Sequence, residues 1–323
     1  MPQLQFSNLN GSWKGNDYKT VSITSVSMNG GRPLAFVFMT HMNADFDGAP
    51  NAYGPPEKNP LDSLDNAGRW AANGYYGLMS VNPNKPVKGV KLDERFPDSQ
   101  GKCPVVQQTG PYAGFYVSTT AKRAPGGSPS QYEQSHYIDS GSIPFCALSY
   151  GLFSKGVGDG DLGVALRLDK YKHAEFHFMG GEGHAKGTSG AGAVGECSYK
   201  VFLDIGGTPK TAAQKYVNNN FSTIFLVFPG SKNSTLSVLS IADFSEDLAA
   251  FMAIQAQVDN ASRGKSGIAA FQQYVAGGRK NKPGSFASIS AALRPLGYVP
   301  NSGGSFAGAV VDVMSATANM LGM

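Results

Sequence analysis

Short segments rich in β-branched and aromatic residues recur through the larger, N-terminal part of the chain, separated by clusters of glycine, proline, asparagine or aspartate. This pattern is typical of β-strands joined by tight turns. The clearest expected strands are residues 20–26, 34–39, 114–119 and 223–228. We therefore expect residues 1–235 to form a mainly β, compact, barrel-like domain.

The pattern changes in the C-terminal part of the chain. Residues 243–246 are typical of a capped helix N-terminus, and apolar residues then follow at helical spacing. The last apolar segment carries too many polar residues to cross a membrane, so no membrane span is expected. Residues 236–323 are predicted to form an all-α extension, with further helices at 267–276, 285–293 and 306–321.

Composition narrows the function classes. Charged residues make up 15% of the 323 residues, against a usual value of about 25%, and 41% are apolar. A coiled coil and a disordered chain are both excluded by these values. Lysine and arginine are scattered, so we expect no nucleic-acid partner, and a net charge of +4 mildly favours an anionic polymer.

The cysteines and the N-terminal sequence indicate in which cellular compartment the protein is made and acts. The three cysteines allow one disulfide at most and show no spacing for zinc, and we expect no cofactor. The N-terminus lacks the basic and apolar regions of a secretory signal. A protein made in the cytoplasm that acts outside it would then be secreted by a non-classical route or delivered to a target periplasm.

Acidic side chains are sparse in the β region, so their positions are informative. Asp45 and Asp47 follow an apolar strand and point the same way if that strand continues, although an Asx-turn at Asp47 would simply end it. Asp161 stands at a strand entry, where a carboxylate either caps backbone donors or faces a site. All three remain candidates for chemistry.

Glu182 and Glu196 lie at the two ends of a glycine-rich loop between two expected strands. Two carboxylates that face each other across a cleft suit glycoside hydrolysis, in which one protonates the leaving oxygen and the other activates water. The alternative is a solvated hairpin whose glutamates keep a sheet edge soluble. No histidine has the spacing of a metal motif. Substrate contacts are expected from residues that can stack on or hydrogen-bond to sugars, namely Asp45, Tyr53, Trp70, Tyr116 and His184.

Seven short motifs, in order over about 190 residues, resemble the fungal-type chitosanases of glycoside hydrolase family 75 and their bacterial relatives. They are the segments at 47–53, 61–68, 112–121, 137–145, 160–164, 194–198 and 227–231.

The resemblance implies an endo-acting, inverting hydrolase of β-1,4-linked glucosamine polymers with one aspartate and one glutamate as the catalytic pair. The family's glutamate corresponds to Glu196. Its aspartate falls where this chain has Glu182, which is a departure, so Asp161 and Asp47 remain alternatives for the base.

Charge refines the expected substrate. Chitosan is a polycation, whereas peptidoglycan has the same amino-sugar backbone and is anionic, so a net charge of +4 favours a muramidase-like activity. We expect a glycoside hydrolase that cleaves internal β-1,4 bonds of an amino-sugar polysaccharide, in the manner of a lysozyme or a chitosanase. It would suit an exported antibacterial effector, with an immunity protein or a secretion-system component as partner. The alternative is a non-catalytic glycan-binding or cell-wall protein on a chitosanase-like fold.

Overall fold

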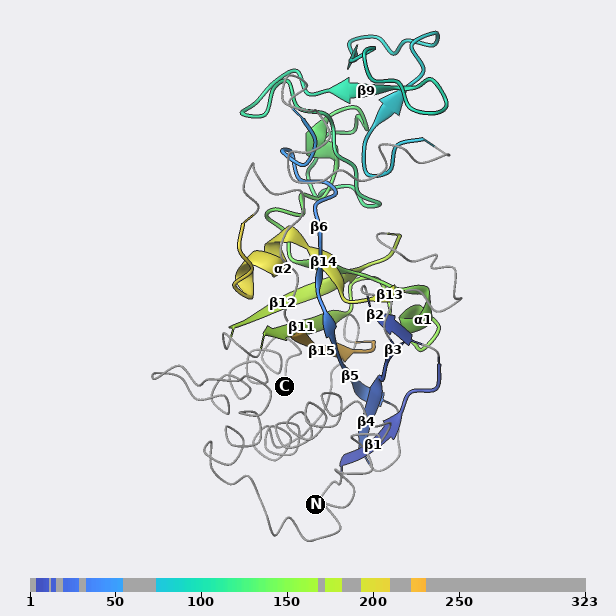
Figure 1. Cartoon of the computed structure of the whole chain (residues 1–323), viewed down its shortest axis with the longest axis vertical. Helices are drawn as coiled ribbons and strands as arrows, with labels where there is room; N and C mark the ends of the chain where they lie inside the picture. The colour runs from blue at the N-terminus through green and yellow to red at the C-terminus, as the bar shows by residue number, and fades with distance from the viewer. Residues whose placement is uncertain are drawn as a thin grey trace.

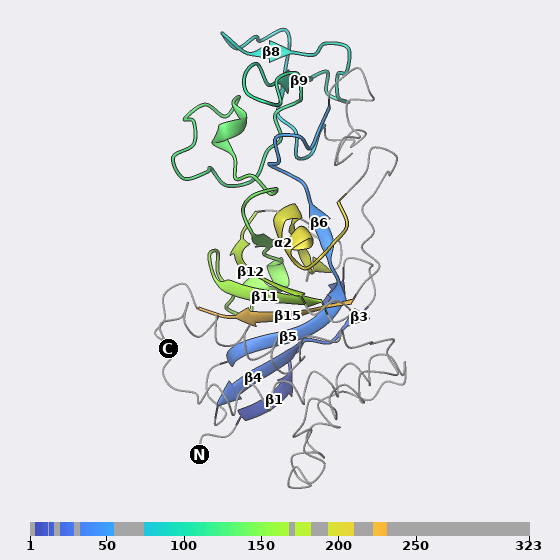
Figure 2. The ribbon, with the colours of Figure 1, turned by 90° about the vertical axis from the view of Figure 1, so that its left-hand side faces the viewer.

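A computed structural model describes residues 4–11, 13–15, 20–28, 33–54, 74–167, 172–181, 193–209 and 222–230. The described chain is mostly strands with few helices, which confirms the mainly β class. A large sheet forms one part of the molecule, and residues 74–144 form a region of short strands and turns at one end (Figures 1 and 2). The expected C-terminal helices lie outside the described residues.

The large sheet has nine strands, and its order shows how distant parts of the sequence meet. Neighbours are antiparallel except for β10 with β12 and β14 with β6, which are parallel. In sheet order the strands are β1 (Leu4–Asn8), β4 (Thr24–Met28), β5 (Pro33–His41), β15 (Ser222–Phe228), β11 (Leu162–Arg167), β12 (Lys172–Met179), β10 (Phe145–Ala147), β14 (Glu196–Ser198) and β6 (Asn43–Asp45).

Two three-stranded sheets and three short helices complete the described elements. One sheet consists of β13 (Ala193–Val194), β2 (Trp13–Gly15) and β3 (Thr20–Val21). The other consists of β7 (Ser80–Val81), β9 (Cys103–Val106) and β8 (Lys91–Leu92). Ser149 and Ser198 accept backbone hydrogen bonds at the starts of α1 (Tyr150–Phe153) and α2 (Tyr199–Asp204), and η2 (Gln134–His136) is a 3-10 turn. Serine at these two positions supplies the acceptor that the first helical turn needs.

The structure tests all four expected strands. Residues 34–39 and 223–228 are strands, within β5 and β15. Residues 20–26 are divided between β3, which pairs with β2, and β4, which pairs with β5. The expectation of a strand at 114–119 is wrong, because this segment forms only turns and isolated β-bridges. Its backbone groups make hydrogen bonds to several different segments instead of to one neighbouring strand.

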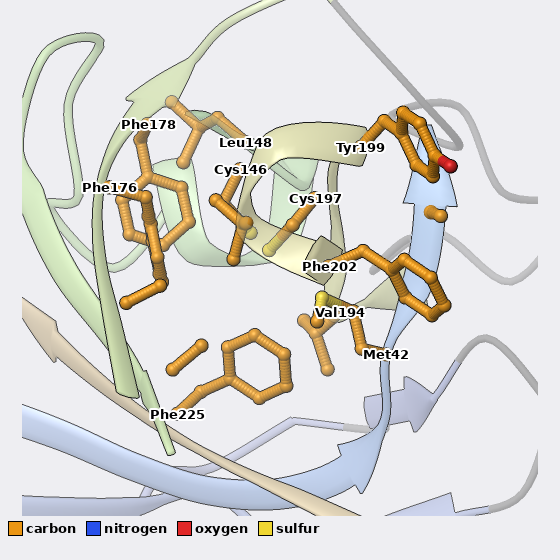
Figure 3. Packing of buried hydrophobic residues seen from close by; sticks show 14 of the residues in the cluster. Met42, Cys146, Leu148, Phe176, Phe178, Val194, Cys197, Tyr199, Phe202 and Phe225 are labelled. Atoms are coloured by element: carbon orange, nitrogen blue, oxygen red, sulfur yellow. The ribbon is translucent and has the colours of Figure 1, made fainter. Parts of the chain in front are cut away.

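The main core lies against the inner side of the large sheet (Figure 3). Phe38 and Phe225 are paired across β5 and β15, and their rings stack with centroids 5.0 Å apart. Phe176 meets Phe225 edge to face at 6.3 Å. Cys146 and Cys197 belong to the same buried cluster. Aromatic packing across β5, β15 and β12 therefore helps to fix the register of this part of the sheet.

Candidate functional site

Side-chain alternation defines a second face on the strands β12, β10, β14 and β6. Phe178, Cys146, Cys197 and Ala44 share one side and belong to the main core. Because successive residues of a strand point to opposite sides, their neighbours along each strand point away from that core. We call this the outer face, and its members are His177, Met179, Phe145, Ala147, Glu196, Ser198, Asn43 and Asp45.

Two of the expected acids lie on the outer face, on adjacent strands. β14 and β6 are parallel, and Glu196 pairs with Asn43 while Ser198 pairs with Asp45. Glu196 and Asp45 are thus on adjacent strands and two residues out of register. With about 4.8 Å between strands and about 3.3 Å per residue, their Cα atoms are about 8 Å apart. Glu196 is partly exposed and Asp45 is buried, with Oδ1 accepting a 2.8 Å hydrogen bond from the Asp47 amide.

A cleft of about 1270 Å³ lies between this part of the sheet and residues 106–144. Phe145, His177 and Met179 of the outer face line it, and so do three tyrosines from the other side: Tyr112, Tyr132 and Tyr137. Glu196 is not among the lining residues. It lies one strand beyond β10, on the same face of the sheet.

Charges of both signs line the cleft. The formal charge of its lining is −1, from Glu133, Asp139 and Asp159 against Lys122 and Arg123. Lys122 Nζ lies 2.9 Å from Asp159 Oδ2. The net charge of the whole chain therefore does not carry over to this cleft, and the local charges favour neither an acidic nor a basic glycan.

Asp47 sits in a turn directly after β6, so the strand does not continue through it. The Tyr53 hydroxyl donates a 2.5 Å hydrogen bond to its Oδ1. A Cβ on Gly77, whose φ is +65°, would lie only 1.9 Å from the same oxygen. Asp47 is thus crowded by Tyr53 and Gly77, whereas the turn hydrogen bond at this point is made by Asp45, whose Oδ1 accepts the Asp47 amide.

Asp161 is 2% exposed and caps backbone donors. Its Oδ2 accepts hydrogen bonds from the amides of Gly158, at 2.6 Å, and Gly230, at 2.8 Å. One oxygen thereby joins the turn before β11 to the turn after β15. This is the structural alternative of the two that the sequence left open.

Tyr53 and Tyr116 are both fully buried, so neither ring can stack on a sugar at the surface. The Tyr116 hydroxyl donates to Asp93 Oδ2 at 2.9 Å, and burial raises the pKa of this tyrosine well above its usual value. Hydrogen bonds from Arg95 hold the pKa of Asp93 below its ordinary value. The remaining expected residues, Glu182, His184 and Trp70, lie outside the described residues.

Cleft residues from 130–144 were not assigned a role from sequence. The signal was present, because residues 137–145 form one of the motifs of the chitosanase resemblance and Tyr137, Asp139 and Phe145 all line the cleft. The Asp139 carboxylate is used locally: it accepts from the Gly141 amide at 2.7 Å and the Ser142 hydroxyl at 2.8 Å. This motif therefore shapes the cleft wall.

In the part of the chain that the structure describes, no cluster of three or more histidine, cysteine, aspartate or glutamate side chains is placed to hold a metal ion. The same residues contain no helix that is long and apolar enough to cross a membrane. Comparison with known proteins found no family model and no curated protein that matches the chain.

Proposed function

We propose that the protein is a glycoside hydrolase that cleaves internal β-1,4 bonds of an amino-sugar polysaccharide, with Glu196 as the general acid. The observation that carries this proposal is the placement of Glu196 and Asp45 on one face of adjacent strands, with Cα atoms about 8 Å apart by strand geometry. In inverting glycosidases the carboxyl groups themselves are roughly 6.5–9.5 Å apart, a separation that two side chains on Cα atoms at this spacing can reach.

The cleft supports a polymeric substrate. Its volume of about 1270 Å³ exceeds what one sugar needs, and tyrosines on its wall offer rings and hydroxyls to a glycan. In this proposal the chain of sugars enters along the cleft and reaches Glu196 past β10. Glu196 then donates its proton to the glycosidic oxygen of the leaving sugar, while a second carboxylate removes a proton from water on the opposite side of the ring.

Two carboxylates are candidates for the base. Glu182 has the sequence position that the chitosanase resemblance suggests, and Asp45 has the position on the sheet. Asp161 and Asp47 are disfavoured because the first caps two amides and the second is enclosed by Tyr53 and Gly77. Comparison of the variants Glu182→Gln and Asp45→Asn separates the candidates: the true base loses turnover while retaining glycan binding.

The test of the proposal uses purified peptidoglycan and chitosan, with released fragments identified by mass spectrometry. Glu196→Gln keeps the shape of the side chain and removes its transferable proton, so we expect turnover to fall at least a hundredfold. Glu94→Gln changes an exposed residue in the region of residues 74–144. It is the matched control and should stay active. Near-native turnover of Glu196→Gln, with unchanged circular dichroism, would refute the assignment.

A non-catalytic glycan-binding protein is the second candidate. It is favoured by one observation: Asp139 and Asp159, two of the carboxylates that line the cleft, are already engaged in hydrogen bonds or an ion pair. Sedimentation with insoluble peptidoglycan or chitosan, without any soluble product, would select this function over hydrolysis.

The exported antibacterial role is part of the same proposal. The C-terminal helical module expected at 236–323 would serve as a targeting or immunity-facing part. Toxicity of the chain when it is directed to the periplasm of a bacterium, but not in its cytoplasm, would support this role. Harmless periplasmic expression of a protein that hydrolyses peptidoglycan in vitro would count against it.

A further inference from the structure

Two buried cysteines lie directly opposite each other on neighbouring strands. Cys146 of β10 and Cys197 of β14 are paired in antiparallel register, and both are almost completely buried. They are reduced in the structure, and Cys146 Sγ donates to the Glu196 carbonyl oxygen at 3.0 Å. Figure 3 shows the two side chains pointing toward each other.

This arrangement meets the distance requirement of a disulfide without movement of the backbone. Residues directly opposite in an antiparallel pair have Cα atoms about 4.5 or 5.5 Å apart, according to their place in the ladder. Disulfides occur at Cα separations of roughly 4.4–6.8 Å. Cys103 has no such partner, since it lies on β9 of a different sheet, opposite Val81. The pairing is therefore unique among the three cysteines.

We propose that Cys146 and Cys197 form a disulfide when the chain folds in an oxidising compartment. An external disulfide is the oxidant. One cysteine thiolate attacks it, which gives a mixed disulfide and releases one external thiol. The thiolate of the second cysteine then attacks the protein sulfur of that mixed disulfide, forms the Cys146–Cys197 bond and displaces the second external thiol.

The surroundings of the pair bear on when the bond forms. Burial, and next the neighbouring Cys146 thiol, raise the pKa of Cys197 well above its ordinary value. Because the thiolate is the attacking species, exchange is slow once the core has closed. The bond therefore forms during folding and afterwards resists reduction. It would join β14, which begins at Glu196, to β10, and so hold the strand of the proposed acid in place.

The test is oxidative refolding of the full chain. Denatured, reduced protein is refolded with a mixture of reduced and oxidised glutathione, denatured again, treated with N-ethylmaleimide and mapped by peptide mass spectrometry. We expect one labelled thiol, at Cys103, and a cross-linked peptide that contains Cys146 and Cys197. A bond closing a loop of about 50 residues should raise the melting temperature by about 10 °C over the reduced protein.

Cys103→Ser is the matched control and should form the same cross-link with no labelled thiol. Cys197→Ser should show no intramolecular cross-link, and mapping of the unaltered chain decides the matter even if this variant does not fold. A cross-link that includes Cys103, glutathione adducts alone, or three labelled thiols after oxidative refolding would each overturn the proposal.

Discussion

Replacement of Asp161 by alanine and by asparagine tests whether this carboxylate is structural or catalytic. A single oxygen, Oδ2, accepts the amides of Gly158 and Gly230, and the residue is 2% exposed. Asparagine can present its amide oxygen at the same place, so both hydrogen bonds survive without the negative charge. Alanine removes the acceptor and leaves two amides in a nearly closed site.

The expected magnitudes follow from these contacts. A hydrogen bond to a charged acceptor contributes about 1.5–3 kcal/mol, so loss of both in Asp161→Ala should lower the free energy of unfolding by about 3–6 kcal/mol. Asp161→Asn loses only the charge assistance and should cost about 1–2 kcal/mol. The neighbouring Asp159 is the control: its ion pair with Lys122 and its hydrogen bond from the Gly180 amide are both exposed, and Asp159→Ala should cost about 1–2 kcal/mol.

Urea unfolding followed by tryptophan fluorescence measures the three variants, and glycan hydrolysis is assayed on the same samples. If the capping argument is right, Asp161→Asn is nearly as stable as the unaltered chain and retains activity. Equal destabilisation by asparagine and alanine would refute it. A stable but inactive Asp161→Asn would instead restore Asp161 as the base.

Two further predictions concern the region of residues 74–144. Gly77→Ala should cost about 2 kcal/mol more than Gly89→Ala in urea unfolding. Both glycines have positive φ, so that cost cancels, but only the Gly77 Cβ would clash with Asp47, whereas Gly89 has nothing within 4 Å. Equal costs would contradict the close approach. Arg95 lowers the pKa of Asp93 from its ordinary 3.8, so its stabilisation is present above that value and is lost as the pH falls through the lowered folded-state pKa. Asp93→Asn should therefore be less stable than the unaltered chain at pH 7, and urea midpoints should converge in strong acid; a constant difference would rule this out.

The long apolar strands could be predicted from sequence because each contains its own run of β-branched and aromatic residues. β5 and β15 contain runs of branched and aromatic residues that favour a buried strand, and the two strands pair with Phe38 opposite Phe225. The segment 114–119 has similar composition but forms no strand. Its Tyr116 turns inward to Asp93, and its amides bond several different loops. The composition of 114–119 therefore indicates that the segment is buried, but its hydrogen-bond partners determine that it does not form a strand.

Local sequence also could not distinguish a structural from a catalytic role for an aspartate beside a glycine. Asp47 and Asp161 were candidates for chemistry because acids are scarce, yet Asp161 accepts two backbone amides and Asp47 accepts the Tyr53 hydroxyl. An aspartate accepts amide hydrogen bonds in a turn with the same oxygens that it would use as a base. Only the identity of the donors, which come from as far away as Gly230, distinguishes these roles.

The candidate site depends on a pairing that no local pattern encodes. Residues 43–45 and 196–198 each alternate polar, apolar, polar, so the sequence alone indicates that their polar residues share a side. It does not indicate that the two strands are neighbours, since about 150 residues separate them and each has only three residues to specify a register. The burial of Ala44 and Cys197 in the core supplies the missing constraint on the register of the two strands. With these two residues facing inward, a shift of the register by one residue would turn Glu196 into the core, and the cost of burying its charge holds Glu196 on the outer face.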